Sequence, residues 1–292
     1  MARTDNLRSI IAMLLAVAFF SVMDLLMKIL VAHYPPLQVA ALRGLSALPL
    51  VMAYVAWSGS GPSLLRVRWR LHLVRGCLAV LMLALFAFGL RSLPLAEAYT
   101  IFFIAPLLIT LMSIPVLKER VARAHWLAIA IGLGGVVVAL RPSTTAFLSL
   151  GALAVLGAAT CYSVSAIIGR LLTRSDSSAS LVFWTTGALA VGGTVLALPG
   201  WLPIRTDDGA LIAGLAVTGF LGQVTITEAF RHGQASVVAP FEYTALAWGM
   251  AIDWLVWASL PTPQTLLGGA IIIASGIYLL RSEQVKVVVL AP

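Results

Sequence analysis

The sequence predicts an all-α, polytopic membrane protein, because its composition is too apolar for a soluble domain and its apolar residues form long runs. The 292-residue chain is 61% hydrophobic and only 10% charged, whereas charged residues make up about 25% of a typical soluble domain. A soluble chain of this length needs a polar shell that these residues cannot supply. The composition therefore excludes a soluble enzyme, a nucleic-acid-binding domain and a disordered chain.

Ten apolar runs have the length of about 20 residues that a helix needs to cross roughly 30 Å of hydrocarbon. Turn-forming residues separate the runs, as at Pro35-Pro36, Pro199-Gly200 and Pro261-Thr262-Pro263. The connections are short, so we expect no folded domain outside the membrane. The ten predicted transmembrane helices are 9–31, 36–57, 71–91, 95–116, 123–140, 149–172, 179–198, 209–230, 235–257 and 264–281.

The basic residues predict the orientation of the chain. Lys and Arg outnumber Asp and Glu by 19 to 11, and most of the basic residues fall on one side of the ten-span arrangement. Basic residues collect in cytoplasmic loops, so we expect both termini in the cytoplasm. The same rule explains the net charge of +8, so we expect no nucleic-acid partner. The expected partner around the chain is the lipid bilayer.

A short internal repeat divides the chain near its middle. Residues 20–30 (FSVMDLLMKIL) align with residues 162–172 (YSVSAIIGRLL), so that the aromatic, Ser-Val and basic positions recur in register. The two segments are 142 residues apart, which assigns five helices to each half. Because five helices cross the membrane an odd number of times, the second half begins on the opposite side and is inverted relative to the first. We therefore predict two inverted five-helix repeats, 1–142 and 143–283, around a central cavity, as in many transporters. The tail 284–292 (QVKVVVLAP) lacks a helical period and is excluded as an appended segment.

Two stretches of the chain resemble a known family. The first has the residues PLAEAY from Pro94, Ala105-Pro106 and Leu117-Lys-Glu119, and the second is QASVVAPFEYTAL from Gln234. They are similar to the two halves of EamA-type carriers in the drug/metabolite transporter superfamily, and more narrowly to bacterial YddG-type exporters of aromatic amino acids. The resemblance implies ten helices in two inverted repeats and a location in the bacterial inner membrane. The family often has an acidic residue at the end of the fourth helix of each half; Glu119 fits this pattern, but Ser259 stands at the second position.

Ionisable residues inside the predicted spans are candidate functional residues, because a charge in hydrocarbon costs at least about 2.5–3.5 kcal/mol. Asp24 and Lys28 are four residues apart and can pair on one helix face. With Arg43 and Glu97 they form a neutral set, which is either a structural network or a vestibule for a zwitterion. The candidates for a charge network or ion coupling are Asp24, Lys28, Arg43, Glu97 and Glu228.

A second set of candidates lies where the substrate path is expected. Glu242 follows Pro240, which has no N–H to donate and opens the helix locally. A tyrosine hydroxyl in hydrocarbon needs a partner, so tyrosines inside spans are expected to face a cavity. An aromatic pocket with a few polar groups fits an apolar solute with a polar head. The substrate-binding candidates are Tyr99, Phe102, Tyr162, Trp184, Glu242, Tyr243 and Trp248.

The sequence favours a secondary carrier over an intramembrane enzyme or a structural membrane protein. It contains no GxGD, GxSG, HExxH or GxxxxGK[ST] motif, so we predict no enzymatic activity, cofactor or metal. The expected function is export of a small amphipathic amino acid, aromatic or an analogue, by alternating access. The alternative is a broader drug or metabolite exporter of the same fold. Small residues on the helices 123–140 and 264–281 leave room for close packing, and we expect a monomer or a weak homodimer.

Overall fold

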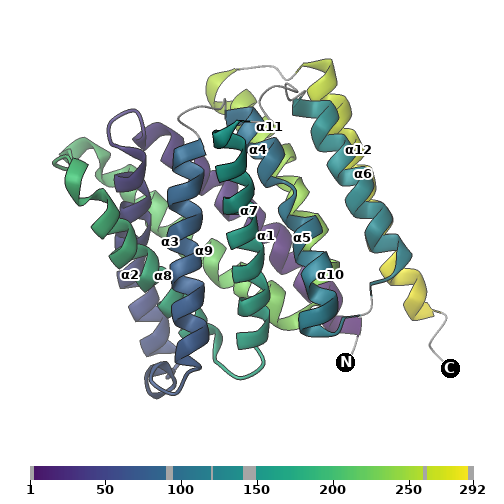
Figure 1. Cartoon of the computed structure of the whole chain (residues 1–292), viewed down its shortest axis with the longest axis horizontal. Helices are drawn as coiled ribbons and strands as arrows, with labels where there is room; N and C mark the ends of the chain where they lie inside the picture. The colour runs from purple at the N-terminus through teal and green to yellow at the C-terminus, as the bar shows by residue number, and fades with distance from the viewer. Residues whose placement is uncertain (1–2, 90–94, 120, 141–148, 259–261, 289–292) are drawn as a thin grey trace.

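The computed structural model describes residues 3–89, 95–119, 121–140, 149–258 and 262–288, which form an all-helical bundle (Figure 1). No β-strand occurs in these ranges. The α-helices are α1 (Arg3–Leu30), α2 (Pro36–Trp57), α3 (Trp69–Gly89), α4 (Leu95–Phe102), α5 (Ala105–Met112), α6 (Arg123–Leu140), α7 (Leu150–Leu172), α8 (Ser178–Ala197), α9 (Gly209–His232), α10 (Ala235–Val238), α11 (Ala245–Trp257) and α12 (Pro263–Val288). The short 3-10 or π segments are η1 (Gly61–Leu64), η2 (Ser113–Leu117), η4 (Leu198–Gly200), η5 (Thr206–Asp208) and η6 (Ala239–Thr244).

The number of spanning helices differs from the sequence prediction. Seven helical segments of the described chain are long and apolar enough to cross a membrane, and Arg123–Ala139 and Pro263–Tyr278 are shorter apolar helices. The remaining predicted span, 235–257, is divided into α10, η6 and α11. Ten continuous transmembrane helices are therefore not confirmed, although apolar helical structure covers each predicted region.

Proline explains the two interrupted regions. Pro240 lies at the start of η6, where the backbone changes from an α-helix to a 3-10 helix, because proline cannot donate the hydrogen bond that an α-helix needs. Pro106 follows the break between α4 and α5. The π-helix η2 ends at Leu117, and the next residue, Lys118, has a left-handed conformation with φ 57°. Interrupted segments at corresponding positions of two halves are a feature of transporter binding sites.

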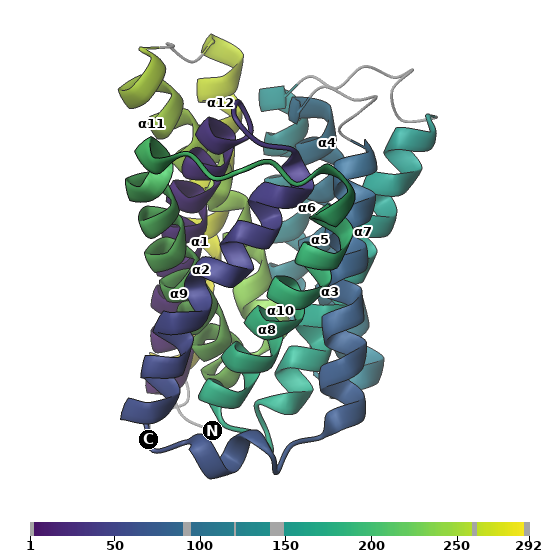
Figure 2. The same cartoon turned by 90° about the vertical axis from the view of Figure 1, so that its left-hand side faces the viewer.

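The helices pair across the two halves of the chain. α1 packs on α9, α3 on α7, α2 on α8 and α6 on α12, and Figure 2 shows α2 and α8 lying side by side on the face toward the viewer. If each helix of the first half is matched to its counterpart in the second half, α1 matches α7, α2 matches α8, α3 matches α9 and α6 matches α12. Exchanging the halves then turns the α1–α9 pair into the α7–α3 pair. The same exchange leaves the α2–α8 and α6–α12 pairs unchanged. This is the pairing that a twofold axis between related halves would produce.

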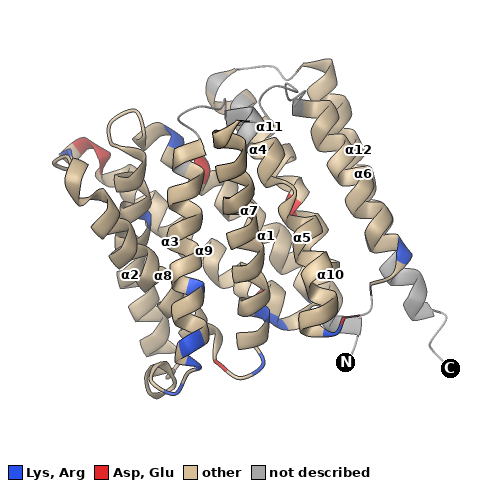
Figure 3. Cartoon of the chain, viewed as in Figure 1, with Lys and Arg blue, Asp and Glu red and all other residues tan. Residues whose placement is uncertain are grey.

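The two helices that contain the repeated sequence run in opposite directions. The start of α1 lies at the end of α9, because a Cβ atom on Gly233 would stand 2.6 Å from the Ser9 Cβ atom. The end of α7 lies at the same side, where Arg231 of α9 donates to the Asp176 carbonyl. We call this side, where α12 also ends (Figure 1), the terminal end, and the opposite side the far end. Basic residues are concentrated at the terminal end (Figure 3), in agreement with their predicted placement on one side.

The tail is helical over part of its length. α12 continues without interruption to Val288, whereas the sequence analysis excluded 284–292 for its lack of a helical period. Helix propagation adds one hydrogen bond per residue without needing an amphipathic pattern, and Gln284–Val288 contains no Gly or Pro to stop it. Residues 289–292 lie outside the described ranges.

Small residues bring α6 and α12 together within the chain. A Cβ atom on Gly135 would lie 2.9 Å from the Gly268 carbonyl oxygen, and Ser275 donates a hydrogen bond of 2.7 Å to the Ala128 carbonyl. The expected close-packing surface is therefore used between these two helices. A homodimer through the same residues would have to displace this contact.

Gly44 allows the closest approach of α2 to α8, so Gly44→Ala is expected to destabilise the fold by about 1–3 kcal/mol, the range for overpacking. A Cβ atom there would lie 2.5 Å from the Ala190 backbone nitrogen. Gly187→Ala on α8 is the matched control, since a Cβ atom at Gly187 meets nothing within 4 Å. Thermal unfolding of the purified variants in detergent measures the difference. Equal midpoints for the two variants would contradict this account of the α2–α8 contact.

Candidate functional site

A cavity of about 360 Å³ lies between the two halves of the bundle. Its lining residues come from α1, α2, α3, α4, α5, α7, α8, α9, η6, α11 and the segment around Phe103. Among the described side chains, none of α6 or α12 lines the cavity; these two helices pack on each other. The volume falls at the lower end of the range of ligand pockets.

Aromatic side chains of α3, α4 and α7 form a continuous apolar wall. Phe86 packs on Phe102 with ring centroids 5.5 Å apart, Phe102 on Tyr162 at 5.6 Å, and Phe86 on Tyr99 at 6.1 Å. All four residues line the cavity. Three of them, Tyr99, Phe102 and Tyr162, were predicted from the sequence, so this part of the expected site is brought together by the fold.

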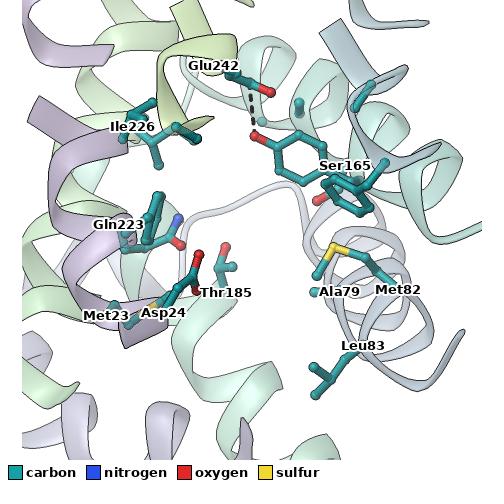
Figure 4. A pocket seen from close by; sticks show the side chains of 18 of the residues that line it. Met23, Asp24, Ala79, Met82, Leu83, Ser165, Thr185, Gln223, Ile226 and Glu242 are labelled. Carbon is teal, nitrogen blue, oxygen red and sulfur yellow. Dashed lines mark hydrogen bonds between the residues drawn. The ribbon is translucent and has the colours of Figure 1, made fainter. Parts of the chain in front are cut away.

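Glu242 and Tyr162 join at one side of the cavity. The Tyr162 hydroxyl donates a hydrogen bond of 3.0 Å to the Glu242 carboxylate (Figure 4), and both residues line the cavity. Glu242 lies in η6, directly after the break at Pro240. The predicted opening of the helix by Pro240 thus places an acidic side chain on the cavity wall rather than in lipid.

Polar groups of three helices lie on another part of the wall. Figure 4 shows Asp24 of α1, Thr185 of α8 and Gln223 of α9 with their polar atoms directed into the cavity, across from Met82 and Leu83 of α3. Asp24 is exposed to this space. A carboxylate beside an amide and a hydroxyl can bind a hydrogen-bond donor such as an ammonium group.

Arg43 is the basic neighbour of Asp24. It lines the cavity, interacts electrostatically with Asp24 and lies over the Phe20 ring at 5.5 Å from its centroid. Lys28, expected to pair with Asp24, has an exposed side chain near the end of α1 and does not line the cavity. The side chain of Glu97 lies outside the described residues. The predicted neutral set of four is therefore represented at the cavity by Asp24 and Arg43.

Arg75 lines the cavity but was not selected from the sequence. Only 9% of its surface is exposed, and its Nε and Nη1 atoms are buried without a hydrogen-bond partner among the residues that the structure describes. In the sequence it contributed to the basic bias of the cytoplasmic side. Its spacing offered a signal, because Arg75, Ala79, Met82 and Phe86 share one face of a helix, and all four line the cavity.

Three predicted substrate-binding residues do not line the cavity. Trp184 donates from Nε1 to the Leu64 carbonyl at 3.1 Å and packs on Trp69, because an indole with a polar N–H suits a loop contact at a helix end. Tyr243 is 1% exposed and fills the space beside Gly132. Trp248 points outward with 42% of its surface exposed. These three residues were selected because they lie within predicted spans, and that criterion does not tell which face of a helix lines the cavity.

Glu228 also lies away from the cavity. Its carboxylate accepts a hydrogen bond from Ser178 and lies 3.1 Å from His232 Nε2 near the end of α9. These contacts anchor α9 to α8 at the terminal end, so the structure places Glu228 in a local contact between helix ends. No group of three or more His, Cys, Asp or Glu side chains within the described ranges is arranged to hold a metal ion.

A network centred on Glu119 connects the two halves at the terminal end. The Glu119 carboxylate accepts hydrogen bonds from the backbone N–H groups of Ala235 and Ser236, at 3.0 and 3.1 Å, and from the Ser236 hydroxyl. It also lies 3.9 Å from Arg170 Nε, and both side chains are at least nine-tenths buried. Arg170 in turn donates to the Arg231 carbonyl. The corresponding position of the second half, Ser259, lies outside the described residues.

Asp176 makes a second connection at the terminal end. Its carboxylate lies 2.8 Å from His72 Nε2 and accepts hydrogen bonds from the Ser175 hydroxyl and the Arg68 backbone N–H. Burial by itself would raise the pKa of Asp176, but these three hydrogen bonds and the His72 charge outweigh it and hold the pKa below its ordinary value. The ionised form is therefore favoured in the folded protein.

This depressed pKa predicts a pH-dependent stability. A carboxylate with a lowered folded pKa stabilises the protein above its unfolded pKa of about 4, and the effect disappears as the pH falls through the folded value. Asp176→Asn is expected to lower the unfolding midpoint at pH 7 by a few degrees, or about 2–4 °C per kcal/mol in a domain of 150–250 residues. The exposed Asp207→Asn is the matched control. A deficit for Asp176→Asn that stays constant as the pH falls below 4 would contradict the prediction.

The cavity, the broken helices and the paired halves point to a transporter, and the comparison with known families agrees. The EamA-like transporter family model matches residues 7–141 and, a second time, residues 149–282. The chain belongs to the EamA-like transporter family. It is thus a multi-pass membrane protein of the drug/metabolite transporter superfamily, with one family repeat in each half, and its family consists of transporters of small molecules rather than enzymes.

Curated relatives span nearly the whole chain. The pseudopaline exporter of Pseudomonas aeruginosa is 29% identical over 96% of this chain and 99% of its own. The riboflavin transporter of Vibrio cholerae is 28% identical over 86% and 85%, and the S-adenosylmethionine uptake transporter of Rickettsia prowazekii is 24% identical over 93% and 92%. A crystal structure with 19% identity has a TM-score of 0.82 and covers 97% of this chain and 100% of its own, which supports the fold. None of these three relatives is named for aromatic amino acids.

Proposed function

We propose that the protein exports small amphipathic amino acids, including aromatic ones and their analogues, across the bacterial inner membrane. The observation that carries this proposal is a cavity between the two halves that combines an aromatic wall with charged groups of both signs. The wall includes Phe86 and Phe102, and the charged groups include Asp24, Arg43 and Glu242. An aromatic wall favours a ring, and the charged groups favour a zwitterionic head.

The same arrangement supports alternating access between inverted repeats. The cavity is bounded by helices of both halves, whose paired contacts follow a twofold pattern. In transporters with inverted repeats, rocking of one half against the other exposes a fixed site to each side in turn. With both termini in the cytoplasm, the terminal end would face the cytoplasm and the far end the outside. The cavity lies within one chain, so this mechanism needs no second copy.

A broader metabolite exporter is the second candidate, and the methionines of the cavity favour it. Met13, Met23, Met27 and Met82 line the cavity, and flexible thioether side chains adapt to solutes of different shape. The three relatives are named for three different solutes, which also supports variation in cargo within this fold.

Transport into proteoliposomes tests the proposal. Labelled tryptophan and phenylalanine are followed by counterflow, with riboflavin, S-adenosylmethionine and a lipophilic cation as competitors. We expect saturable tryptophan transport that phenylalanine inhibits and the lipophilic cation does not. Inhibition by all the competitors would favour the broader exporter, and no movement of either amino acid would refute the proposal. Protein-free liposomes are the control for leakage.

A further inference from the structure

Arg75 is a cavity residue that forms no ion pair with an acidic side chain in the described part of the chain. Two other arginines have an acidic neighbour: the half-buried Arg43 interacts with Asp24, and the buried Arg170 approaches Glu119 and donates to the Arg231 carbonyl. The Nε and Nη1 atoms of Arg75 are buried and have no hydrogen-bond partner among the described residues, and its electrostatic neighbour is the Tyr162 hydroxyl group. Leaving a buried charge uncompensated is costly, typically by several kcal/mol.

The guanidinium of Arg75 lies against the backbone of α7 at the wall of the cavity. Gly169 of α7 faces the guanidinium, and a Cβ atom there would lie 3.3 Å from the Arg75 Cζ and Nη2 atoms. The glycine thus allows the guanidinium to lie close to the α7 backbone while it stays on the cavity wall. Gly169, Arg75 and Thr173 all line the cavity.

We propose that Arg75 binds the carboxylate of the transported solute, which makes an anionic group a requirement for efficient transport. This inference rests on the proposed function and names the part of the solute that the site selects. A guanidinium has a planar set of donors that fits a carboxylate through two parallel hydrogen bonds. Asp24 and Glu242 line the same cavity, so the ammonium group of an amino acid has acidic partners at a separate place on the wall.

The experiment compares solutes that differ only in the acidic group. Transport of tryptophan, tryptophanamide and tryptamine is measured in proteoliposomes that contain the wild type, Arg75→Gln or Arg75→Lys. We expect the wild type to prefer tryptophan over tryptophanamide at least tenfold, consistent with the strength of a hydrogen bond to a charged group. Arg75→Gln is expected to lose the preference and still transport the amide. Arg75→Lys should retain part of it, because lysine keeps the charge without the planar donor set.

Arg281→Gln is the matched control, because it removes the same charge from an exposed position on α12. An unchanged preference in Arg75→Gln, or wild-type transport of the amide as fast as that of the acid, would overturn the inference. If Arg75→Gln does not fold, as judged by size-exclusion chromatography, Arg75→Lys decides: an unchanged preference in that variant also overturns it.

A binding measurement separates this inference from the proposed function. If the wild type transports neither amino acid, the proposed function has failed, and the site is tested by thermal unfolding with indole-3-propionate and its neutral amide. Stabilisation by the acid alone that disappears in Arg75→Gln would support the carboxylate site. Equal effects of the acid and the amide, or no effect of either, would overturn it.

Discussion

Asp24→Asn is expected to slow transport at least tenfold and to leave the amount of inserted, folded protein close to that of the wild type. Asp24 is exposed to the cavity and interacts electrostatically with Arg43. Without this carboxylate, the cavity retains Arg43 and Arg75 but loses an acidic group that can receive an ammonium. Because the substitution removes a charge rather than adding one, it lowers the cost of insertion.

Two further variants separate a role in transport from a role in folding. Asp207→Asn makes the same substitution at an exposed loop position and is expected to have no effect on transport. The double variant Asp24→Asn/Arg43→Gln restores the charge balance of the pair. If charge balance were the only role of Asp24, the double variant would recover transport. We expect it to stay slow because the carboxylate beside Thr185 and Gln223 remains absent. A normal initial rate for Asp24→Asn, measured with tryptophan in proteoliposomes, would remove Asp24 from the mechanism.

The general architecture follows from the sequence because it depends on composition and length. A helix is the simplest way to satisfy backbone polar groups in hydrocarbon, so runs of about 20 apolar residues were sufficient to locate the helices. The breaks at Pro106 and Pro240 also follow from local chemistry, since proline lacks the N–H group. The region 235–257 was predicted as one span with a local opening at Pro240, and the structure divides it into α10, η6 and α11.

The cavity face is where the sequence is less informative. All faces of a helix in a membrane bundle are apolar, so Tyr162 and Tyr243 look alike in sequence although only Tyr162 lines the cavity. Ionisable residues near predicted interfaces are equally ambiguous. Arg75 and Glu228 both lie within one or two turns of a span end, yet Arg75 lines the cavity and Glu228 does not. The packing of the helices on one another determines which of these side chains faces the cavity. The spacing of residues along a single helix does not reveal that packing.

Glu119 shows how a distant contact gives a residue its role. In the sequence it fits the acidic position that the family often has at the end of the fourth helix of each half, and no contact of it could be predicted. In the structure it receives hydrogen bonds from Ala235 and Ser236 of the second half and lies near Arg170. Since η2 precedes Glu119 and the Pro240 break follows α10, the contact connects the interrupted regions of the two halves.

This contact predicts that Glu119→Gln opens the terminal end of the cavity. Hydrogen bonds to a charged group contribute about 1.5–3 kcal/mol, and the loss of the charge weakens those from Ala235 and Ser236 together with the attraction to Arg170. If the contact exists only in the state closed at this end, losing 1.5 kcal/mol shifts the two-state equilibrium about tenfold toward the open state. Ser165 on the cavity wall is the reporter position, because Ser165→Cys changes little in size.

The measurement is the rate at which a membrane-impermeant maleimide labels Ser165→Cys from the terminal side, in a background with Cys77→Ser and Cys161→Ser. We expect Glu119→Gln to increase this rate about tenfold. Glu228→Gln is the matched control, because the carboxylate of Glu228 lies at the same end and contacts Ser178, His232 and the Arg231 side chain instead of the N–H groups of Ala235 and Ser236. An equal increase in both variants would indicate general loosening of the bundle. An unchanged rate in Glu119→Gln would show that this network does not hold the terminal end closed, even if the variant transported more slowly.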